Sequence, residues 1–209
     1  MKLVLASNNA KKLVELQALF APLAIELVTQ GSLGIDEAEE PHVTFVENAL
    51  AKARHAAQQA RAAAMADDSG LCVDALGGAP GVQSAVYASV PTTPGPREEL
   101  RRIHDSANNR LLLERLQGVA DRRAAFVSAL VAVRSHDDPE PLIAFGRWNG
   151  VILDAPRGAG GFGYDPIVFI PALDRAVAEL DATTKNRHSH RAIASQHMHA
   201  LMREVWRLG

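Results

Sequence analysis

The chain begins with the stretch MKLVLASNNAKKLVELQALF, residues 1–20, which contains a short apolar run, a polar break and an amphipathic segment. Leu3, Val4 and Leu5 have the apolar and partly β-branched character of a buried strand. From residue 11 to residue 19 the leucines recur at helical spacing, so we expect a helix there. A strand, a polar turn and a helix in direct succession indicate an α/β protein.

Strand and helix patterns continue to alternate along the rest of the chain. A long run of strands between residues 124 and 153 has no helix inside it, so its strands should be neighbours in the sheet. The fold class expected is therefore α/β, with a mixed central sheet flanked by helices. Strands are expected at 25–28, 71–73, 124–133, 142–145, 148–153 and 167–170, helices at 44–65, 97–116 and 192–208, and a mobile connection at 91–96.

Length and charge limit the class of protein. The 209 residues, 47% of them hydrophobic, suffice for one globular domain with a substantial core. The formal net charge of −2 argues against a surface that binds polymeric nucleic acid. One cysteine, Cys72, excludes an internal disulfide, and no window resembles a signal peptide or a membrane span. We therefore expect a cytoplasmic protein that is not embedded in a membrane.

The polar break after the first strand, from Ser7 to Lys12, has the composition of an anion site. A helix start exposes unpaired N–H groups and a partial positive charge, and here a hydroxyl, two amides and two ammonium groups lie beside it. Phosphate would be the natural ligand. The alternative is that Ser7 or Asn9 serves only as a helix cap.

A second polar break, Asp67-Asp68-Ser69-Gly70, is expected to be a turn at the mouth of a strand. Adjacent carboxylates repel each other unless a cation or a proton compensates them, so one of the pair often binds a metal or acts as a base. Oxygen ligands favour Mg²⁺, and the acidic loop 36–40 could add one. The alternative is an acidic turn in solvent.

The glycine cluster Gly158 to Gly163 matches the pattern GxGxxG. In a dinucleotide-binding fold that pattern opens a helix after the first strand, whereas a β-branched strand follows here, so we reject this interpretation. The backbone could instead lie against a flat ligand, with Phe162 and Tyr164 stacked on it, unless both aromatics belong to the core.

The segment Lys185 to Arg191 concentrates cationic and donor groups before the last helix, and these suit the carbonyl oxygens of a base or a phosphate. His197 and His199 invite a metal interpretation. Residues two apart on a helix point to different faces, so we expect surface histidines instead. Cys72, between Leu71 and Val73, is expected to be a buried apolar residue.

Taken in order, these segments resemble the Ham1/RdgB family of inosine and xanthosine triphosphate pyrophosphatases. The resemblance spans nearly the whole chain. It rests on residues 5–12 with Glu15, 44–49 with Lys52, 66–88 around Asp67-Asp68-Ser69-Gly70, 161–166, and Lys185 with Ser189-His190-Arg191.

The resemblance implies hydrolysis of ITP, dITP and XTP to the monophosphate and pyrophosphate, by a homodimer whose single domain, 1–209, has two lobes around a central active-site cleft. It implies that Asp68 is the catalytic base and binds Mg²⁺ together with Glu40. The substrate-binding residues implied are Ser7, Asn8, Asn9, Ala10, Lys11, Lys12 and Lys52 around the triphosphate, Ser69, and Phe162, Gly163, Tyr164, Asp165, Lys185, His190 and Arg191 around the purine.

Donors such as Lys185 and Arg191 would favour a 6-keto purine, because an adenine amino group would face unpaired donors. Two positions depart from the family pattern: Val86 stands where arginine is common, and Asn8 where glycine is common. Two other functions stay open at this point, a Maf-type pyrophosphatase of modified pyrimidine nucleotides and a non-catalytic nucleotide sensor.

Overall fold

The computed structural model describes residues 1–23, 25–91 and 94–208. Two of the residues in the expected connection 91–96, residues 92–93, lie outside this range. The helices are α1 (Ala10–Phe20), α2 (Phe45–Ala60), α3 (Arg97–Arg115), α4 (Ala182–His188) and α5 (His190–Val205). The strands are β1 (Lys2–Leu5), β2 (Glu26–Thr29), β3 (Ala64–Val73), β4 (Arg123–Val133), β5 (Leu142–Ile152), β6 (Val168–Ile170) and β7 (Arg175–Ala176).

The seven strands form one sheet in the order β2-β1-β3-β4-β5-β6-β7. Strand β1 pairs in parallel with both β2 and β3. The pairs β5–β6 and β6–β7 are antiparallel. The expectation of a mixed sheet flanked by helices is confirmed.

The chain divides into two compact units. Unit 1 comprises Met1–Ser69, Ser128–Arg147 and Asn186–Gly209, and unit 2 comprises Gly70–Val127 and Trp148–Lys185. Strands β3, β4 and β5 contribute residues to both units. In the described part of the chain, no helix combines the length and the apolar character needed to cross a membrane.

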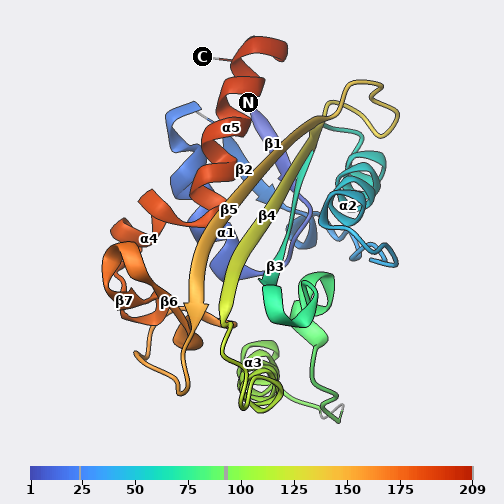
Figure 1. The fold of residues 1–209 in the computed structure, drawn as a ribbon. Helices are drawn as coiled ribbons and strands as arrows, with labels where there is room; N and C mark the ends of the chain where they lie inside the picture. The colour runs from blue at the N-terminus through green and yellow to red at the C-terminus, as the bar shows by residue number, and fades with distance from the viewer. Residues whose placement is uncertain (24, 92–93, 209) are drawn as a thin grey trace. The chain divides into compact units, whose positions relative to one another are not determined.

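Unit 1 has two apolar layers, one on each face of its strands (Figure 1). Side chains alternate along β1, so Leu3 and Leu5 pack with α1 and α5 while Val4 packs with α2. The α2 layer consists largely of alanines, including Ala49, which lets the helix approach the strands closely. The N-terminal strand is thus covered on both faces, as its apolar sequence requires.

Unit 2 has its own core, in which α3 packs against the parts of β3, β4 and β5 that belong to this unit. Leu112 of α3 and Leu116, the residue that caps the end of this helix, belong to a cluster that includes Phe126 and Trp148. These residues are at most 8% exposed. Helix α3 therefore has a fixed position within unit 2.

Two element boundaries were predicted wrongly in the region after α2. The helix expected at 44–65 ends at Ala60, where Arg61 adopts a left-handed conformation and caps it. The chain then enters β3 at Ala64, three residues before the carboxylate pair. Alanine favours a helix, but burial of Ala64 and Met65 in the sheet overrides that local preference.

The predicted turn at Asp67-Asp68-Ser69-Gly70 is also wrong. All four residues lie inside β3, a ten-residue strand, and the first two are 1% and 7% exposed. A charged pair is tolerated in a buried strand only where partners compensate it, and those partners come from elements distant in sequence. Strand β7 and helix α4 were not anticipated.

The loop between β4 and β5 is organised by one buried carboxylate, that of Asp138. Its oxygens accept hydrogen bonds from the backbone N–H groups of Arg134 and Glu140 and from the Arg134 guanidinium, at 2.8–3.0 Å. These hydrogen bonds hold the pKa of Asp138 well below its ordinary value, and the one from the Arg134 guanidinium has the largest effect. The ionised carboxylate thus stabilises the folded state.

We expect Asp138→Asn to lower the free energy of unfolding by about 1.5–3 kcal/mol at pH 7, because an amide cannot accept all these hydrogen bonds. Since the folded pKa is depressed, the advantage of the wild type is present above the unfolded pKa, about 3.9, and shrinks as the pH falls below it. Urea unfolding of both proteins at a series of pH values measures this. A difference that stays constant down to pH 3 would contradict the assignment.

Candidate active site

The carboxylate of Asp67 is the centre of a buried polar network in unit 1. Its Oδ2 lies 2.9 Å from the Lys12 ammonium of α1 and 3.0 Å from Nε of Arg191 in α5. Its Oδ1 accepts a 2.7 Å hydrogen bond from the Ser128 hydroxyl of β4. Ser69 also donates to Oδ2, at 3.0 Å. One side chain therefore joins three elements to β3.

Opposite charges keep Asp67 ionised in this buried position. Burial alone would raise the pKa of Asp67, but Lys12 and Arg191 hold it well below its ordinary value. Burial in turn lowers the pKa of Lys12, and Asp67 offsets part of that effect. The two charges stabilise each other.

All three nitrogens of the Arg191 guanidinium donate hydrogen bonds within unit 1. Besides Asp67, it donates to Glu15 of α1 at 3.0 Å and to the Ser69 hydroxyl at 2.8 Å. A planar guanidinium can serve three acceptors in fixed directions, which an ammonium cannot. The structure thus places Arg191, predicted to contact a purine, in contact with carboxylates and a hydroxyl.

A second cluster surrounds Lys52 of α2. Its ammonium lies 2.8 Å from Oδ1 of Asp68 and 2.7 Å from Oε2 of Glu40. Burial opposes the charge of Lys52, yet the two carboxylates leave its pKa above the ordinary value. The structure therefore brings together Lys52, Asp68 and Glu40, which the sequence predicted to act at one site.

The two carboxylates of this cluster differ in their environment. Burial raises the pKa of Asp68, and Lys52 offsets only part of the effect. Burial also acts on Glu40, but Lys52 leaves the pKa of Glu40 below its ordinary value. Oδ2 of Asp68 is buried and has no hydrogen-bond partner among the described residues. Such an oxygen is suited to accept a proton or to bind a cation.

The residues present fit a hard cation that keeps several non-protein ligands. Among residues 1–23, 25–91 and 94–208, no group of three or more His, Cys, Asp or Glu side chains has the geometry of a complete metal site. Mg²⁺ often binds through one or two carboxylates plus water and substrate phosphates. The unpartnered Oδ2 of Asp68 and the neighbouring Glu40 offer such a partial ligand set.

The turn before α1 forms as predicted, with Asn9 as the cap. The Asn9 side chain accepts from the backbone N–H groups of Lys11 and Lys12, at 3.1 and 3.3 Å. The Ser7 hydroxyl accepts from the backbone of Asn9. Two of the amides at the helix start therefore already have an acceptor. Ala10, the first residue of α1, is exposed.

Asn8 connects this turn to the acidic loop, because its Nδ2 donates to Glu37 at 3.0 Å. Glu37 thus accepts a hydrogen bond from Asn8, while Glu40 forms an ion pair with Lys52. The other family departure, Val86, is 60% exposed in unit 2. The geometry distinguishes Glu40 from the other glutamates of the acidic loop.

The predicted base-binding residues of unit 2 form a third cluster. The Asp165 carboxylate is buried and lies 2.7 Å from the Lys185 ammonium. The same oxygen accepts from the backbone N–H of Phe162 at 2.9 Å. Lys185 lies 4.5 Å from the centre of the Phe162 ring, a cation–π contact. Phe162 is half-buried.

Tyr164 belongs to the core of unit 2 instead. It is 4% exposed, and its hydroxyl donates to the Ser84 carbonyl at 2.9 Å. Burial raises the pKa of Tyr164 above its ordinary value. His190, the first residue of α5, is buried in unit 1. The chain after Gly163 enters a short 3₁₀ turn and β6, which confirms that the glycine pattern does not open a dinucleotide-binding helix.

Sequence reasoning missed three residues that hold these clusters. Ser128 lies in an apolar strand, where nothing in the sequence distinguished it from a core position. Asp105 and Asn109 lie on α3 and contact Gly163, 58 and 54 residues away. Their spacing of four places both on one helix face, a signal that could have been used.

The remaining predictions concern isolated side chains. His197 is exposed, as predicted, and its Nδ1 lies 2.8 Å from the Phe145 carbonyl. His199 is half-buried, with its ring edge-on to Phe20, so the surface prediction is wrong for it. Cys72 is also half-buried, because it points to the face of β3 opposite Leu71 and Val73.

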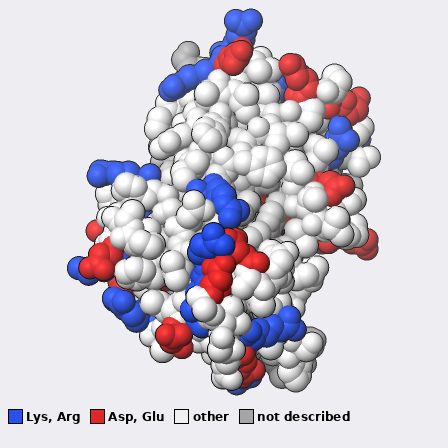
Figure 2. Space-filling view, in the orientation of Figure 1, with Lys and Arg blue, Asp and Glu red and all other residues white. Residues whose placement is uncertain are grey.

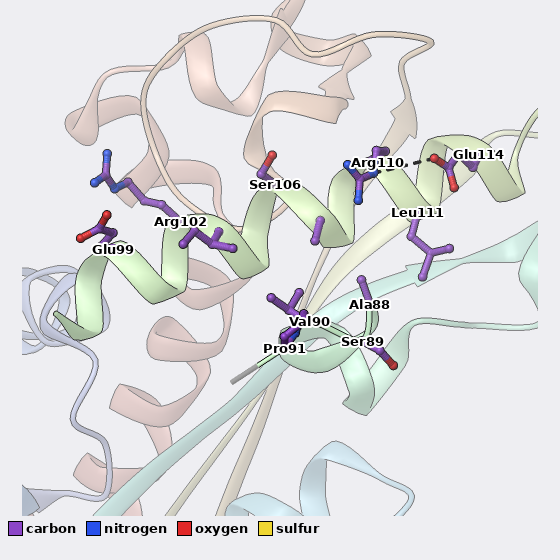
Figure 3. A pocket seen from close by; sticks show the side chains of 12 residues that line it. Ala88, Ser89, Val90, Pro91, Glu99, Arg102, Ser106, Arg110, Leu111 and Glu114 are labelled. Carbon is purple, nitrogen blue, oxygen red and sulfur yellow. Dashed lines mark ion pairs between the residues drawn. The ribbon is translucent and has the colours of Figure 1, made fainter. Parts of the chain in front are cut away.

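A pocket of about 700 Å³ lies elsewhere in unit 2, between α3 and the segment 88–91 (Figure 3). None of the predicted site residues lines it. Its charged side chains come from one face of α3, and Arg110 pairs there with Glu114 (Figure 3). On the face of the molecule drawn in Figure 2, Lys and Arg alternate with Asp and Glu and do not merge into one basic area.

Comparison with known proteins finds full-length similarity. A model of the Ham1 family matches residues 3–201. A dITP/XTP pyrophosphatase of Methylibium petroleiphilum is 72% identical over 206 residues, 99% of each chain. One of Leptothrix cholodnii is 66% identical over 211 residues, 100% of each chain. The structure of a HAM1 protein from Coxiella burnetii has a TM-score of 0.86 and 41% identity, covering 98% of this chain and 100% of that chain.

We expect Arg191→Met to lower the free energy of unfolding by about 3–5 kcal/mol, because it leaves two carboxylates in a buried network without their shared cation. Arg187→Met is the matched control, since Arg187 is exposed and precedes the same helix. Chemical denaturation of the three proteins measures the effect. Equal stabilities of the two variants would contradict a stabilising role for the network.

Proposed function

Because the chain belongs to the Ham1 family, we propose that it hydrolyses the non-standard purine nucleoside triphosphates ITP, dITP and XTP to the monophosphate and pyrophosphate. The observation that carries this is the Lys52 ammonium between Asp68 and Glu40, beside a buried and unpartnered carboxylate oxygen. This is a site for phosphate chemistry. The relatives named dITP/XTP pyrophosphatase, up to 72% identical, support the same substrates. Removal of these triphosphates would keep them out of DNA and RNA.

We propose that residues 1–209 act as one domain, and that each unit supplies its own set of binding groups. Unit 1 supplies groups for the triphosphate: Ser7, Asn8, Asn9, Ala10, Lys11, Lys12, Lys52 and Ser69. Unit 2 supplies Phe162, whose ring is suited to a purine face and is held by Asp165 and Lys185, with Gly163 and Tyr164 as the intervening residues of the same loop.

The proposed metal is Mg²⁺, held by Asp68 and Glu40. When bound, Mg²⁺ supplies a Lewis acid that withdraws charge from the phosphate oxygens and the attacked phosphorus. Lys12 and Lys52 add positive charge beside the phosphates. Both lysines are positioned by carboxylates within unit 1, so little reorganisation is needed to place them.

The proposed base is Asp68. Its Oδ2 accepts a proton from the water that attacks the α-phosphorus, and the leaving group is pyrophosphate. Lys52, bonded to the other oxygen, fixes the orientation of the carboxylate.

Base selection is proposed to depend on donors near the 6-position of the purine. Lys185 would donate to a keto oxygen, whereas an adenine amino group would leave it unpaired. Arg191 would act mainly by holding Ser69 and Asp67, since its guanidinium already has three acceptors. The names of the relatives favour purine substrates over the Maf-type pyrimidine alternative, and favour catalysis over a sensor role.

We further propose a cytoplasmic homodimer. The exposed Ile143 and Phe145 lie on one side of β5 and are apolar side chains that a second copy would cover. Sedimentation velocity tests this: a species of twice the 22.4 kDa chain mass supports it, and a monomer at micromolar concentration contradicts it.

The reaction is tested by supplying a panel of nucleoside triphosphates with Mg²⁺. We expect pyrophosphate from ITP, dITP and XTP, and hydrolysis of ATP slower by two orders of magnitude or more, because the 6-amino group of adenine would leave the buried donors mispaired. Chelation of the metal should abolish turnover. Release of orthophosphate from ITP, or a preference for dTTP or UTP, would refute the proposal.

We expect Asp68→Asn to lower kcat on ITP by about 10²–10⁴-fold, because the amide keeps the shape but cannot accept a proton. Glu40→Gln should raise the Mg²⁺ concentration needed for half-maximal rate. Glu39→Gln, in the same exposed loop, is the matched control and should behave as wild type. Steady-state kinetics against Mg²⁺ concentration measure both effects. Wild-type turnover by Asp68→Asn would exclude Asp68 as the base.

A further inference from the structure

Helix α3 is hydrogen-bonded to both backbone polar groups of Gly163, and so to the two peptide groups that flank this residue. The Gly163 N–H donates to Oδ2 of Asp105 at 2.8 Å. The Gly163 carbonyl accepts from Nδ2 of Asn109 at 3.0 Å. Asp105 and Asn109 are four residues apart, so they lie on one face of the helix. One turn of α3 thus provides an acceptor and a donor that match the two polar groups of a single residue.

The residue held in this way follows Phe162, the half-buried aromatic proposed to contact the purine. Gly163 has a φ of +62°, a conformation that side-chain-bearing residues rarely adopt. A residue earlier, the Phe162 N–H is bonded to Asp165. The backbone is therefore fixed on both sides of the Phe162 ring, and the Lys185 ammonium is fixed by the same Asp165 oxygen.

The two α3 side chains do not belong to the pocket on the neighbouring face of that helix. The pocket is lined by other α3 residues, among them Arg102, Ser106 and Arg110 (Figure 3). Asn109 is only 9% exposed, and the helix continues from it to Leu112 in the core of unit 2. Asp105 and Asn109 therefore lie on a helix whose position is fixed by its packing in the core of unit 2.

We propose that Asp105 and Asn109 are positioning residues for base selectivity, which act by fixing the backbone of Gly163 and through it the Phe162 ring. They need not touch the substrate. A ring held in one place presents the purine edge to Lys185 in one orientation, so that a keto and an amino group are distinguished. This inference rests on the proposed function, because it assigns selectivity to the same site.

The chemistry of the two contacts predicts an asymmetry between two isosteric exchanges. In Asp105→Asn an amide oxygen remains to accept from the Gly163 N–H. In Asn109→Asp the donor becomes a carboxylate, which faces the Gly163 carbonyl and repels it. The first exchange should be mild and the second severe, although each changes one charge on the same helix face.

The experiment compares kcat/KM for ITP and for ATP in five proteins: wild type, Asp105→Asn, Asp105→Ala, Asn109→Asp and the control Ser106→Ala. Ser106 is exposed on the same turn of α3. We expect Asp105→Ala and Asn109→Asp to reduce the ITP-to-ATP ratio about tenfold or more, equivalent to about 1.4 kcal/mol. Asp105→Asn should stay within about threefold of wild type, and Ser106→Ala should be unchanged.

The amide proton of Gly163 gives a readout that does not need activity. In protein labelled with ¹⁵N-glycine, a strong hydrogen bond to a carboxylate shifts this proton downfield. We expect an upfield shift in Asp105→Ala, a smaller one in Asp105→Asn and none in Ser106→Ala. Because Asp105 is only half-buried, these variants should fold, which the remaining glycine signals would verify.

Two results would overturn the inference: an equal loss of kcat/KM for ITP and ATP in Asp105→Ala and Asn109→Asp, or an effect of Asp105→Asn as large as that of Asp105→Ala. If the wild type does not hydrolyse ITP, the proposed function fails. The Gly163 shifts would then still show whether α3 fixes the loop, so the two failures are distinguishable.

Discussion

The carboxylate of Asp67 lies in the interior of unit 1. An uncompensated charge there would cost more than the free energy of unfolding of most domains. Its compensation requires Lys12 from α1, Arg191 from α5 and Ser128 from β4 at the same time. These three elements must therefore pack around β3 in one arrangement. The same arrangement places Lys12 and Ser69 at the site proposed for the phosphates.

The local sequence predicts those parts of the fold that depend on neighbours in the chain. The helix cap at Asn9 and the alternation of Leu3, Val4 and Leu5 are of this kind, and both are observed. The strand through Asp67 and Asp68 is not, because two adjacent carboxylates resemble a turn until their partners are known. Those partners are up to 124 residues away in sequence, so no local window contains them.

For the site, residue type was more informative than local conformation. The chain has five lysines, of which four were predicted to act at the site, and three of these, Lys12, Lys52 and Lys185, each pair with a carboxylate. The spacing of Asp105 and Asn109 places them on one helix face, but their contact with Gly163 depends on where α3 packs, which the local sequence does not contain. Arg191 shows the same limit, since its residue type fits a keto oxygen as well as it fits the carboxylates that it contacts.

The charge balance of unit 1 bears on how a triphosphate could be accommodated. The cations Lys12, Lys52 and Arg191 are matched there by the carboxylates Glu15, Glu40, Asp67 and Asp68. These seven groups have a net charge of −1, so they cannot by themselves neutralise a ligand with several negative charges. A divalent cation beside Asp68 and Glu40 would reverse the sign of the cluster. The divalent cation proposed at this site would then serve substrate binding as well as the chemical step, because without added positive charge the carboxylates that orient the lysines would repel the phosphates.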